Sequence, residues 1–204
     1  MIIYMSDILC ITNRFLCKEN FLVRIEKIAS AHPAGIVLRE KDMTEDAYAE
    51  LAAAVMELCK KHGVPCILHS FVKAAKKLGS SSLHLPLPVL RSLSAEEKRL
   101  FPLLGTSCHS AEDAIEAEKL GCSYIIAGHI FDTDCKKGLP GRGLDFLQKI
   151  CESVSIPVYA IGGINSENIK AVRKTGASGA CVMSGTMLCN DVPTYFSQMQ
   201  LSAK

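Results

Sequence analysis

The sequence lacks the features of nucleic-acid-binding and membrane proteins. Lysine and arginine number 23 against 21 aspartate and glutamate residues, so the formal net charge is only +2 and no basic patch dominates. Nucleic acid is therefore not an expected partner. No apolar run approaches the roughly 20 residues of a membrane-spanning helix, so we expect no membrane association. Tryptophan is absent, and the remaining composition is that of an ordinary soluble globular domain.

The ten cysteines show no paired spacing. The absence of any CxxC pair argues against zinc-ribbon and thioredoxin-like motifs. The amino-terminal stretch MIIYMSDILCI has neither the basic region nor the small-residue cleavage site of a secretory signal peptide. Free thiols without an export signal predict a cytoplasmic protein in a reducing compartment.

One unit, a helical segment followed by glycine and a short apolar run, recurs along the chain. The helical segments end in KKHG, KKLG, EKLG and RKTG, with the glycines at 63, 79, 121 and 176. Glycine suits the left-handed residue that closes a helix, and the apolar runs are typical of strands buried on both faces. We expect eight strands, near residues 7–12, 34–38, 65–69, 81–85, 102–106, 123–127, 157–161 and 178–183. Seven clear helices and a weaker one near 94–100 follow them.

This alternation predicts one α/β domain over residues 1–204. Strict strand–helix alternation indicates a parallel sheet, and eight units favour closure into a compact (β/α)8 TIM barrel. An open doubly wound sheet is the alternative, because short strands are easily miscounted. In a barrel the functional groups are expected where the strands run out into the following loops.

Two glycine-containing loops predict a phosphate site. IGGIN places Gly162 and Gly163 after the seventh strand, and MSGTM places Ser184 and Gly185 after the eighth. Glycine lets the backbone approach a ligand closely, and the N–H groups at a helix start favour an anion. The alternative is that these glycines only make tight turns.

Cationic and polar residues follow other strands. Arg39 and Lys41, in LREKD after the second strand, are candidates for binding a second anion such as a carboxylate or phosphate, although a solvated charge run fits as well. Ser107, in TSCHS after the fifth strand, is a further candidate for substrate binding.

Four histidines, at 69, 84, 109 and 129, fall at consecutive strand ends. Histidine is a common zinc ligand, but no carboxylate spacing supports a metal site, so we expect none. His129 opens the long polar loop GHIFDTDCKKGLPGRG, residues 128–143, and is the candidate acid–base catalyst.

The same loop supplies three more candidates, Thr133, Cys135 and Lys136. A neighbouring lysine can lower the pKa of a cysteine thiol, but no general base is evident beside Cys135, so a hydrogen-bonding role is favoured over a nucleophilic one.

Four stretches resemble the thiamine phosphate synthase superfamily over nearly the whole chain: LREKD, CHSAEDAIEAEKLGCSYIIAGHIF, IPVYAIGGINSENI and GACVMSGT. The resemblance implies a single (β/α)8 barrel that binds a thiazole phosphate. It also implies that the phosphate lies against Gly163 and the Met183–Ser184 turn.

The chain departs from the synthase pattern at three places. The synthases carry Asn-Asp-Arg after strand 3, where this chain has His69-Ser70-Phe71, and Gly-Gln-x-Asp after strand 4, where it has Pro86-Leu87-Pro88-Val89. Their two aspartates help to hold the Mg²⁺ of a pyrophosphate substrate. Val37 also replaces the glutamine that precedes LREK. Synthase activity is therefore the less favoured interpretation.

The loop 128–143 is similar to the TenI branch, the thiazole tautomerases, in which a histidine replaces the proline of the synthase Gly-Pro-Ile-Phe. The resemblance implies a cofactor-free isomerase of thiamine biosynthesis, a thiazole tautomerase, in which His129 would move a proton while a carboxylated thiazole phosphate becomes aromatic. A non-catalytic, regulatory thiazole phosphate-binding protein is one alternative, and a thiamine phosphate synthase is another. The resemblance also implies a homodimer.

Overall fold

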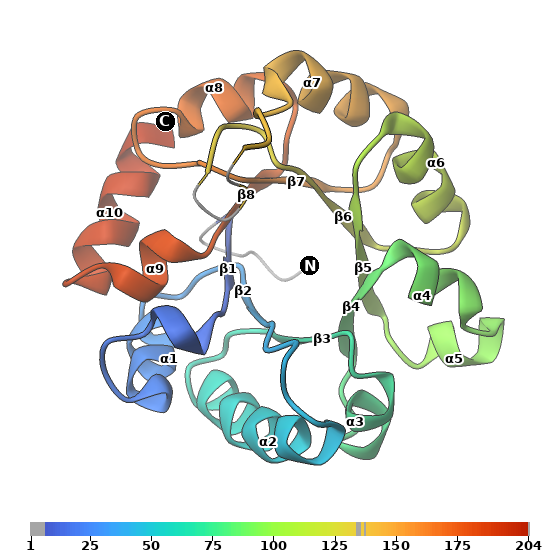
Figure 1. Ribbon diagram of the computed structural model, residues 1–204, viewed down its shortest axis with the longest axis vertical. Helices are drawn as coiled ribbons and strands as arrows, with labels where there is room; N and C mark the ends of the chain where they lie inside the picture. Colours follow the sequence, from blue (N-terminus) through green and yellow to red (C-terminus); the bar gives the residue numbers. More distant parts are fainter. Residues whose placement is uncertain (1–6, 134–135, 137, 204) are drawn as a thin grey trace.

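A computed structural model of the chain describes residues 7–133, 136 and 138–203. Its eight strands are all parallel and close into one barrel in sequence order, with β8 pairing with β1. Figure 1 looks down the barrel axis and shows the helices as a ring outside the sheet. The protein is thus a single compact (β/α)8 TIM barrel, as the sequence alternation predicted.

Each expected strand overlaps an observed one, with ends that differ by a residue or two. The strands are β1 (Ile8–Ile11), β2 (Gly35–Leu38), β3 (Cys66–His69), β4 (Ser82–Pro86), β5 (Leu103–Cys108), β6 (Tyr124–Gly128), β7 (Val158–Ile161) and β8 (Gly179–Val182).

The helices alternate with these strands. They are the 3₁₀ helix η1 (Arg14–Leu16) and the α-helices α1 (Phe21–Ser30), α2 (Glu45–Lys61), α3 (Val72–Lys77), α4 (Leu87–Ser92), α5 (Ala95–Arg99), α6 (Ala111–Lys119), α7 (Gly143–Ser153), α8 (Ile169–Lys174), α9 (Ser184–Leu188) and α10 (Val192–Ala203). The expected weak helix is α5. The sequence did not indicate α4, which begins after Pro86 and carries Pro88 in its first turn, where no N–H partner is needed. Within the described part of the chain, no helix combines the length and apolarity required to cross a bilayer.

Local sequence explains where these helices begin and end. The side chains of Asn20, Thr44, Ser94 and Ser110 accept backbone N–H groups at the starts of α1, α2, α5 and α6. The four glycines at the predicted helix ends have φ between +62° and +91°, the left-handed region that glycine enters at least cost.

The core has two layers. A large outer cluster packs the strands against the helices, and a smaller inner cluster fills the barrel. Inside the barrel, glycine on one strand makes room for an aromatic ring on the next. A Cβ atom at Gly105 would lie 2.2 Å from the ring of Tyr124. Because β5 pairs Gly105 with Tyr124 of β6, that ring turns inward and brings a hydroxyl into the barrel interior.

Candidate functional site

The loop after β6 packs directly on the loop after β7. Phe131 N donates to Gly162 O at 3.0 Å. A Cβ at Gly162, where φ is +104°, would lie 2.4 Å from the Cβ of His129. A Cβ at Gly163, where φ is +66°, would lie 2.5 Å from Asp132 O. The two glycines are therefore needed for the contact between the loops, in addition to any contact with a ligand.

His129 is half-buried at the base of this loop. Its Nε2 donates to Leu139 O at 3.2 Å, and its own carbonyl accepts from Arg142 N at 3.0 Å. The Arg142 guanidinium donates to His109 O at 2.8 Å, and His109 Nδ1 donates to Gly128 O at 3.0 Å. These contacts tie the two ends of the loop together and hold it to the loop after β5.

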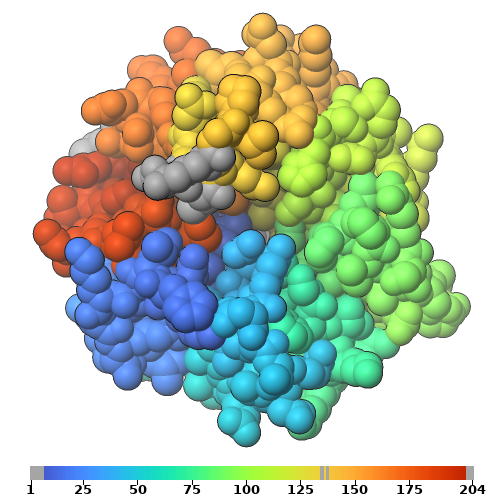
Figure 2. All heavy atoms as spheres, viewed as in Figure 1, coloured from blue at the N-terminus to red at the C-terminus, as the bar shows by residue number. Residues whose placement is uncertain are grey.

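A cleft of about 850 Å³ lies between this loop and the segments after β7 and β8. Figure 2 views the same end of the barrel and shows the yellow loop standing beside the orange and red segments. Four predicted site residues line the cleft: Thr133, Lys136, Gly163 and Ser184. Together they offer an ammonium group, two hydroxyls and a backbone free to approach a ligand, which suits a small phosphorylated molecule.

The remaining predicted residues do not line this cleft. Gly162 and His129 lie behind it, in the contact between the two loops. Met183 is half-buried immediately before α9, and its carbonyl accepts from the Thr186 hydroxyl at 3.1 Å. Cys135 lies outside the described residues.

The cleft wall also contains residues that were not predicted, among them Leu16, Leu188 and Tyr195. They give one side of the cleft an apolar and aromatic character, as an uncharged ring would require. Leu16 follows β1, so a complete reading of strand ends would have included it. Tyr195 comes from α10, which carries no motif and reaches the cleft only through the packing of the fold.

The segment after β2 separates its cations from its carboxylates. The carboxylate of Glu40, 1% exposed, accepts from the Thr12 hydroxyl at 2.6 Å, from Arg14 N at 3.1 Å and from Arg14 Nη1 at 3.2 Å. Arg14 also forms an ion pair with Asp42. Arg39 N donates to Thr12 Oγ1 at 3.0 Å, which fixes the backbone where the strand ends.

Arg39 and Lys41 form no ion pair with any residue that the structure describes, and neither does Lys136. Partial burial of Lys41, together with the nearby charges of Arg39 and Lys136, lowers the pKa of its ammonium group. Lys41 therefore lies within electrostatic range of a residue of the cleft, and the three cations form one positive region at the barrel mouth.

Two buried histidines lie beside this positive region. His69 and His84 are paired in the sheet register, and their rings stack with centroids 5.5 Å apart. His84 hydrogen bonds through Nδ1 with the Tyr124 hydroxyl at 3.0 Å and through Nε2 with the Ser107 hydroxyl at 2.9 Å. His69 Nδ1 lies 2.7 Å from Ser70 Oγ. The predicted residue Ser107 therefore orients a histidine.

Burial keeps both imidazoles neutral. It lowers the pKa of His69 to about 2, with further lowering by the charges of His84, Lys41 and Arg39. Burial, with a smaller effect of Lys41, lowers the pKa of His84 to about 3. These side chains add no positive charge to the mouth at neutral pH.

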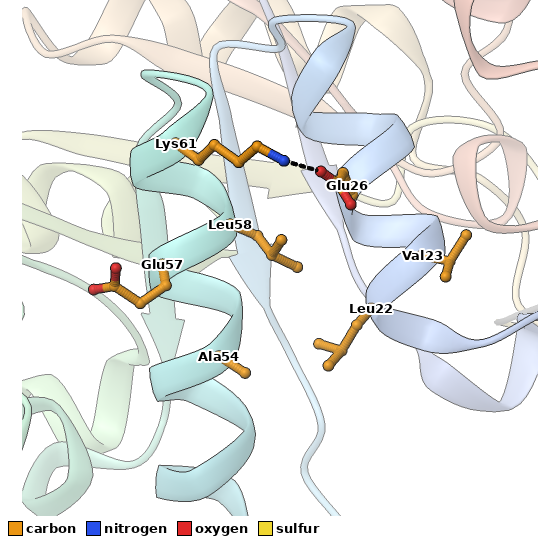
Figure 3. Close-up of a pocket in the computed structure, with 7 residues that line it drawn as sticks. All are labelled: Leu22, Val23, Glu26, Ala54, Glu57, Leu58 and Lys61. Atoms are coloured by element: carbon orange, nitrogen blue, oxygen red, sulfur yellow. Dashed lines mark hydrogen bonds and ion pairs between the residues drawn. The ribbon is translucent and has the colours of Figure 1, made fainter.

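A second hollow, of about 520 Å³, lies on the outside of the barrel between α1 and α2 (Figure 3). Leu22 and Leu58 project into it, and an ion pair between Lys61 and Glu26 spans its rim at 2.5 Å. It lies between two outer helices and not at the strand ends, so it is not the candidate active site.

The fold and the cleft together define a (β/α)8 barrel whose functional groups lie at the carboxyl ends of its strands. The chain belongs to the thiamine monophosphate synthase family, which matches it over residues 8–186.

Several relatives are similar over most of its length. A thiamine-phosphate synthase of Syntrophomonas wolfei is 34% identical over 189 residues, covering 89% of this chain and 88% of that protein. Thiamine-phosphate synthase 2 of Streptococcus pneumoniae is 34% identical over 188 residues, with coverage of 89% and 88%. A solved structure of thiamine phosphate pyrophosphorylase from Pyrococcus furiosus superimposes with a TM-score of 0.81 at 29% identity, covering 97% of this chain and 95% of that one.

These relatives overturn the functional prediction from sequence. The assignment as a thiazole tautomerase, and the preference for it over synthase activity, are wrong because the similar curated proteins are thiamine-phosphate synthases. The regulatory alternative is set aside for the same reason. Packing offers a physical reason for the misleading motif in loop 128–143: a Cβ at Gly141, for example, would lie 2.5 Å from Ile130 O. At least this glycine of the motif is therefore required by the packing of the loop.

The Mg²⁺ implied by the family resemblance does not fit the residues present. The strand ends that would supply its carboxylates lead into Ser70 and Leu87. No group of three or more histidine, cysteine, aspartate or glutamate side chains among the described residues could hold a metal ion. Glu40 is occupied by Arg14, and the Asp132 carboxylate accepts from a backbone N–H at 2.7 Å.

Proposed function

We propose that this chain is a thiamine phosphate synthase, which joins a thiazole phosphate to a pyrimidine diphosphate and releases diphosphate. One observation carries the proposal: the cleft of Lys136 and Ser184 adjoins the positive region of Arg39 and Lys41, so one barrel mouth offers two anion sites. The names of the similar proteins support the same reaction.

The two sites would hold the two substrates. The thiazole phosphate would lie in the cleft, with its phosphate toward Gly163, Ser184 and Lys136 and its ring toward the apolar wall. The diphosphate of the pyrimidine would face Arg39 and Lys41, and Lys136 would contact both anions. A ring nitrogen of the thiazole then forms the new C–N bond, and the C–O bond to the diphosphate breaks with its electron pair leaving on oxygen. Fixed positive charge stabilises that departing group.

The other predictions remain open within this proposal. His129 stays a predicted site residue, although the condensation needs no proton shuttle from it. Met183 and Gly162 would support the phosphate loops from behind. The nine cysteines that the structure describes are free, which supports our placing of the protein in the cytoplasm. We also expect a homodimer.

The test is product formation from the two substrates. The purified chain is incubated with thiazole phosphate and pyrimidine diphosphate, with magnesium and with a chelator, and thiamine phosphate is measured by chromatography. Product under either condition supports the proposal, whereas none under both refutes it. Replacing Lys136 by glutamine should lower kcat/KM about tenfold, since a charged contact to phosphate is lost. The control Lys119→Gln, an exposed lysine at the end of α6, should leave the rate unchanged.

A further inference from the structure

The positive region at the barrel mouth is arranged to hold a multiply charged anion by itself. Arg39 and Lys136 lie within electrostatic range of Lys41. None of these three cations has an ion-pair partner among the described residues. Three like charges that remain uncompensated repel one another, so an anion placed between them relieves that repulsion as well as forming its own contacts.

The two carboxylates that are close in sequence to these cations are paired with a third cation, Arg14. Glu40 and Asp42 alternate with Arg39 and Lys41, and both are bound by Arg14. The Glu40 carboxylate is 1% exposed. With these acids bound by Arg14, Arg39 and Lys41 have no ion-pair partner among the described residues, and no described group of three or more acidic, histidine or cysteine side chains could hold a metal ion.

The strand ends next to the cations carry neutral groups. His69 is the last residue of β3, and its ring stacks on that of His84. Both ring nitrogens of His84 form hydrogen bonds with hydroxyl groups. Neutral imidazole is a poor ligand for Mg²⁺, which prefers oxygen. The imidazoles therefore fill the volume beside the anion site without attracting a magnesium ion.

From this arrangement we propose that the chain binds diphosphate directly through Arg39, Lys41 and Lys136, without a divalent cation. The inference rests on the proposed function for the identity of the anion as a diphosphate leaving group. The ammonium and guanidinium groups would take over the charge neutralisation that a metal ion would otherwise supply.

Calorimetry with inorganic pyrophosphate tests this directly. Titrations of the full chain are run in a chelator and again with magnesium in excess. We expect binding in the chelator, and no tighter binding when magnesium is added. Binding that requires magnesium, or no binding in either buffer, would overturn the inference.

Substitutions locate the site. Arg39→Gln and Lys41→Gln should each weaken pyrophosphate binding in the chelator by about tenfold, because each removes a charged contact. Lys119→Gln, on the exposed end of α6, is the matched control and should bind as the parent does. Because Lys41 is only partly buried and forms no ion pair with a described residue, its replacement should not affect folding, which thermal unfolding checks. Unchanged affinity in both mouth variants would overturn the inference.

Restoring a carboxylate provides the converse experiment. Ser70 has φ of +68°, a conformation that aspartate enters more readily than most residues, so Ser70→Asp should be tolerated. The added negative charge should weaken pyrophosphate binding in the chelator and make it responsive to magnesium. A variant that folds, by thermal unfolding, and shows no change in either quantity would contradict the inference.

The outcomes for the two proposals are separable. Metal-free pyrophosphate binding without formation of thiamine phosphate would leave this inference standing and refute the synthase function. Formation of thiamine phosphate only with magnesium, together with magnesium-dependent pyrophosphate binding, would do the reverse.

Discussion

Replacement of Glu40 by alanine should destabilise the protein by about 3 kcal/mol, at the lower end of what breaking a buried ion pair costs. The carboxylate accepts from the Thr12 hydroxyl and from the backbone and guanidinium of Arg14. Hydrogen bonds to a charged group contribute about 1.5–3 kcal/mol each. The expected loss of stability is smaller than the sum of these contributions, because the Arg14 side chain is 28% exposed and keeps Asp42 as a partner. Removing the carboxylate also removes its own desolvation cost.

Urea unfolding measures this loss, with an unchanged denaturant slope as the sign that only stability has changed. For a chain of this size, about 3 kcal/mol corresponds to a fall in melting temperature of about 6–12 °C. Glu50→Ala, on the exposed face of α2, is the matched control and should change stability by less than about 0.5 kcal/mol. A loss below about 1 kcal/mol for Glu40→Ala would show that water replaces the carboxylate, and the reasoning would fail.

Three further measurements test the loops, the histidines and the cleft. Gly162→Ala should destabilise the protein by more than about 2 kcal/mol in urea unfolding, because the new methyl group clashes with His129 and the backbone has a positive φ. The control is Gly121→Ala, where φ is +90° and no atom lies near the new methyl group. This control has the backbone strain alone and should therefore lose less stability. Burial lowers the pKa of His69 from 6.5 to about 2 and that of His84 from 6.5 to about 3. Below pH 6.5, the unfolded chain therefore binds more protons than the folded chain. The free energy of unfolding should therefore show no loss from these histidines above pH 6.5 and should decrease below it, by at most about 1.4 kcal/mol per pH unit for each histidine. A free energy of unfolding that stays constant down to about pH 5 would contradict this. Lys136→Gln should raise the KM for thiazole phosphate by about tenfold in steady-state assays, and an unchanged KM would remove this residue from the site.

Much of the barrel was predictable because its signals are local. A glycine that ends a helix, such as Gly63 or Gly121, reports a positive φ that the sequence alone can indicate, and both glycines have one. Apolar runs between such glycines gave the strands. The helix α4 was not predicted, although Pro88 lies in its first turn, where a proline has no N–H bond to lose.

The site was only partly predictable, because it depends on contacts between distant segments. The strand-end rule placed Thr133, Gly163 and Ser184 together, and they line one cleft. It could not find Tyr195, whose position depends on how α10 packs. Nor could it show that Ser107 turns to His84, since that contact depends on the register of β4 against β5.

The charge pattern of the segment after β2 shows how a net-neutral stretch can make a positive surface. Arg39, Glu40, Lys41 and Asp42 carry alternating charges that cancel in sequence. Arg14, supplied by the loop after β1, binds both acids, and the Glu40 carboxylate becomes buried. The two cations are left without an ion-pair partner among the described residues. The local field is therefore set by a partner 26 residues away from Glu40, which explains why net charge gave no sign of an anion site.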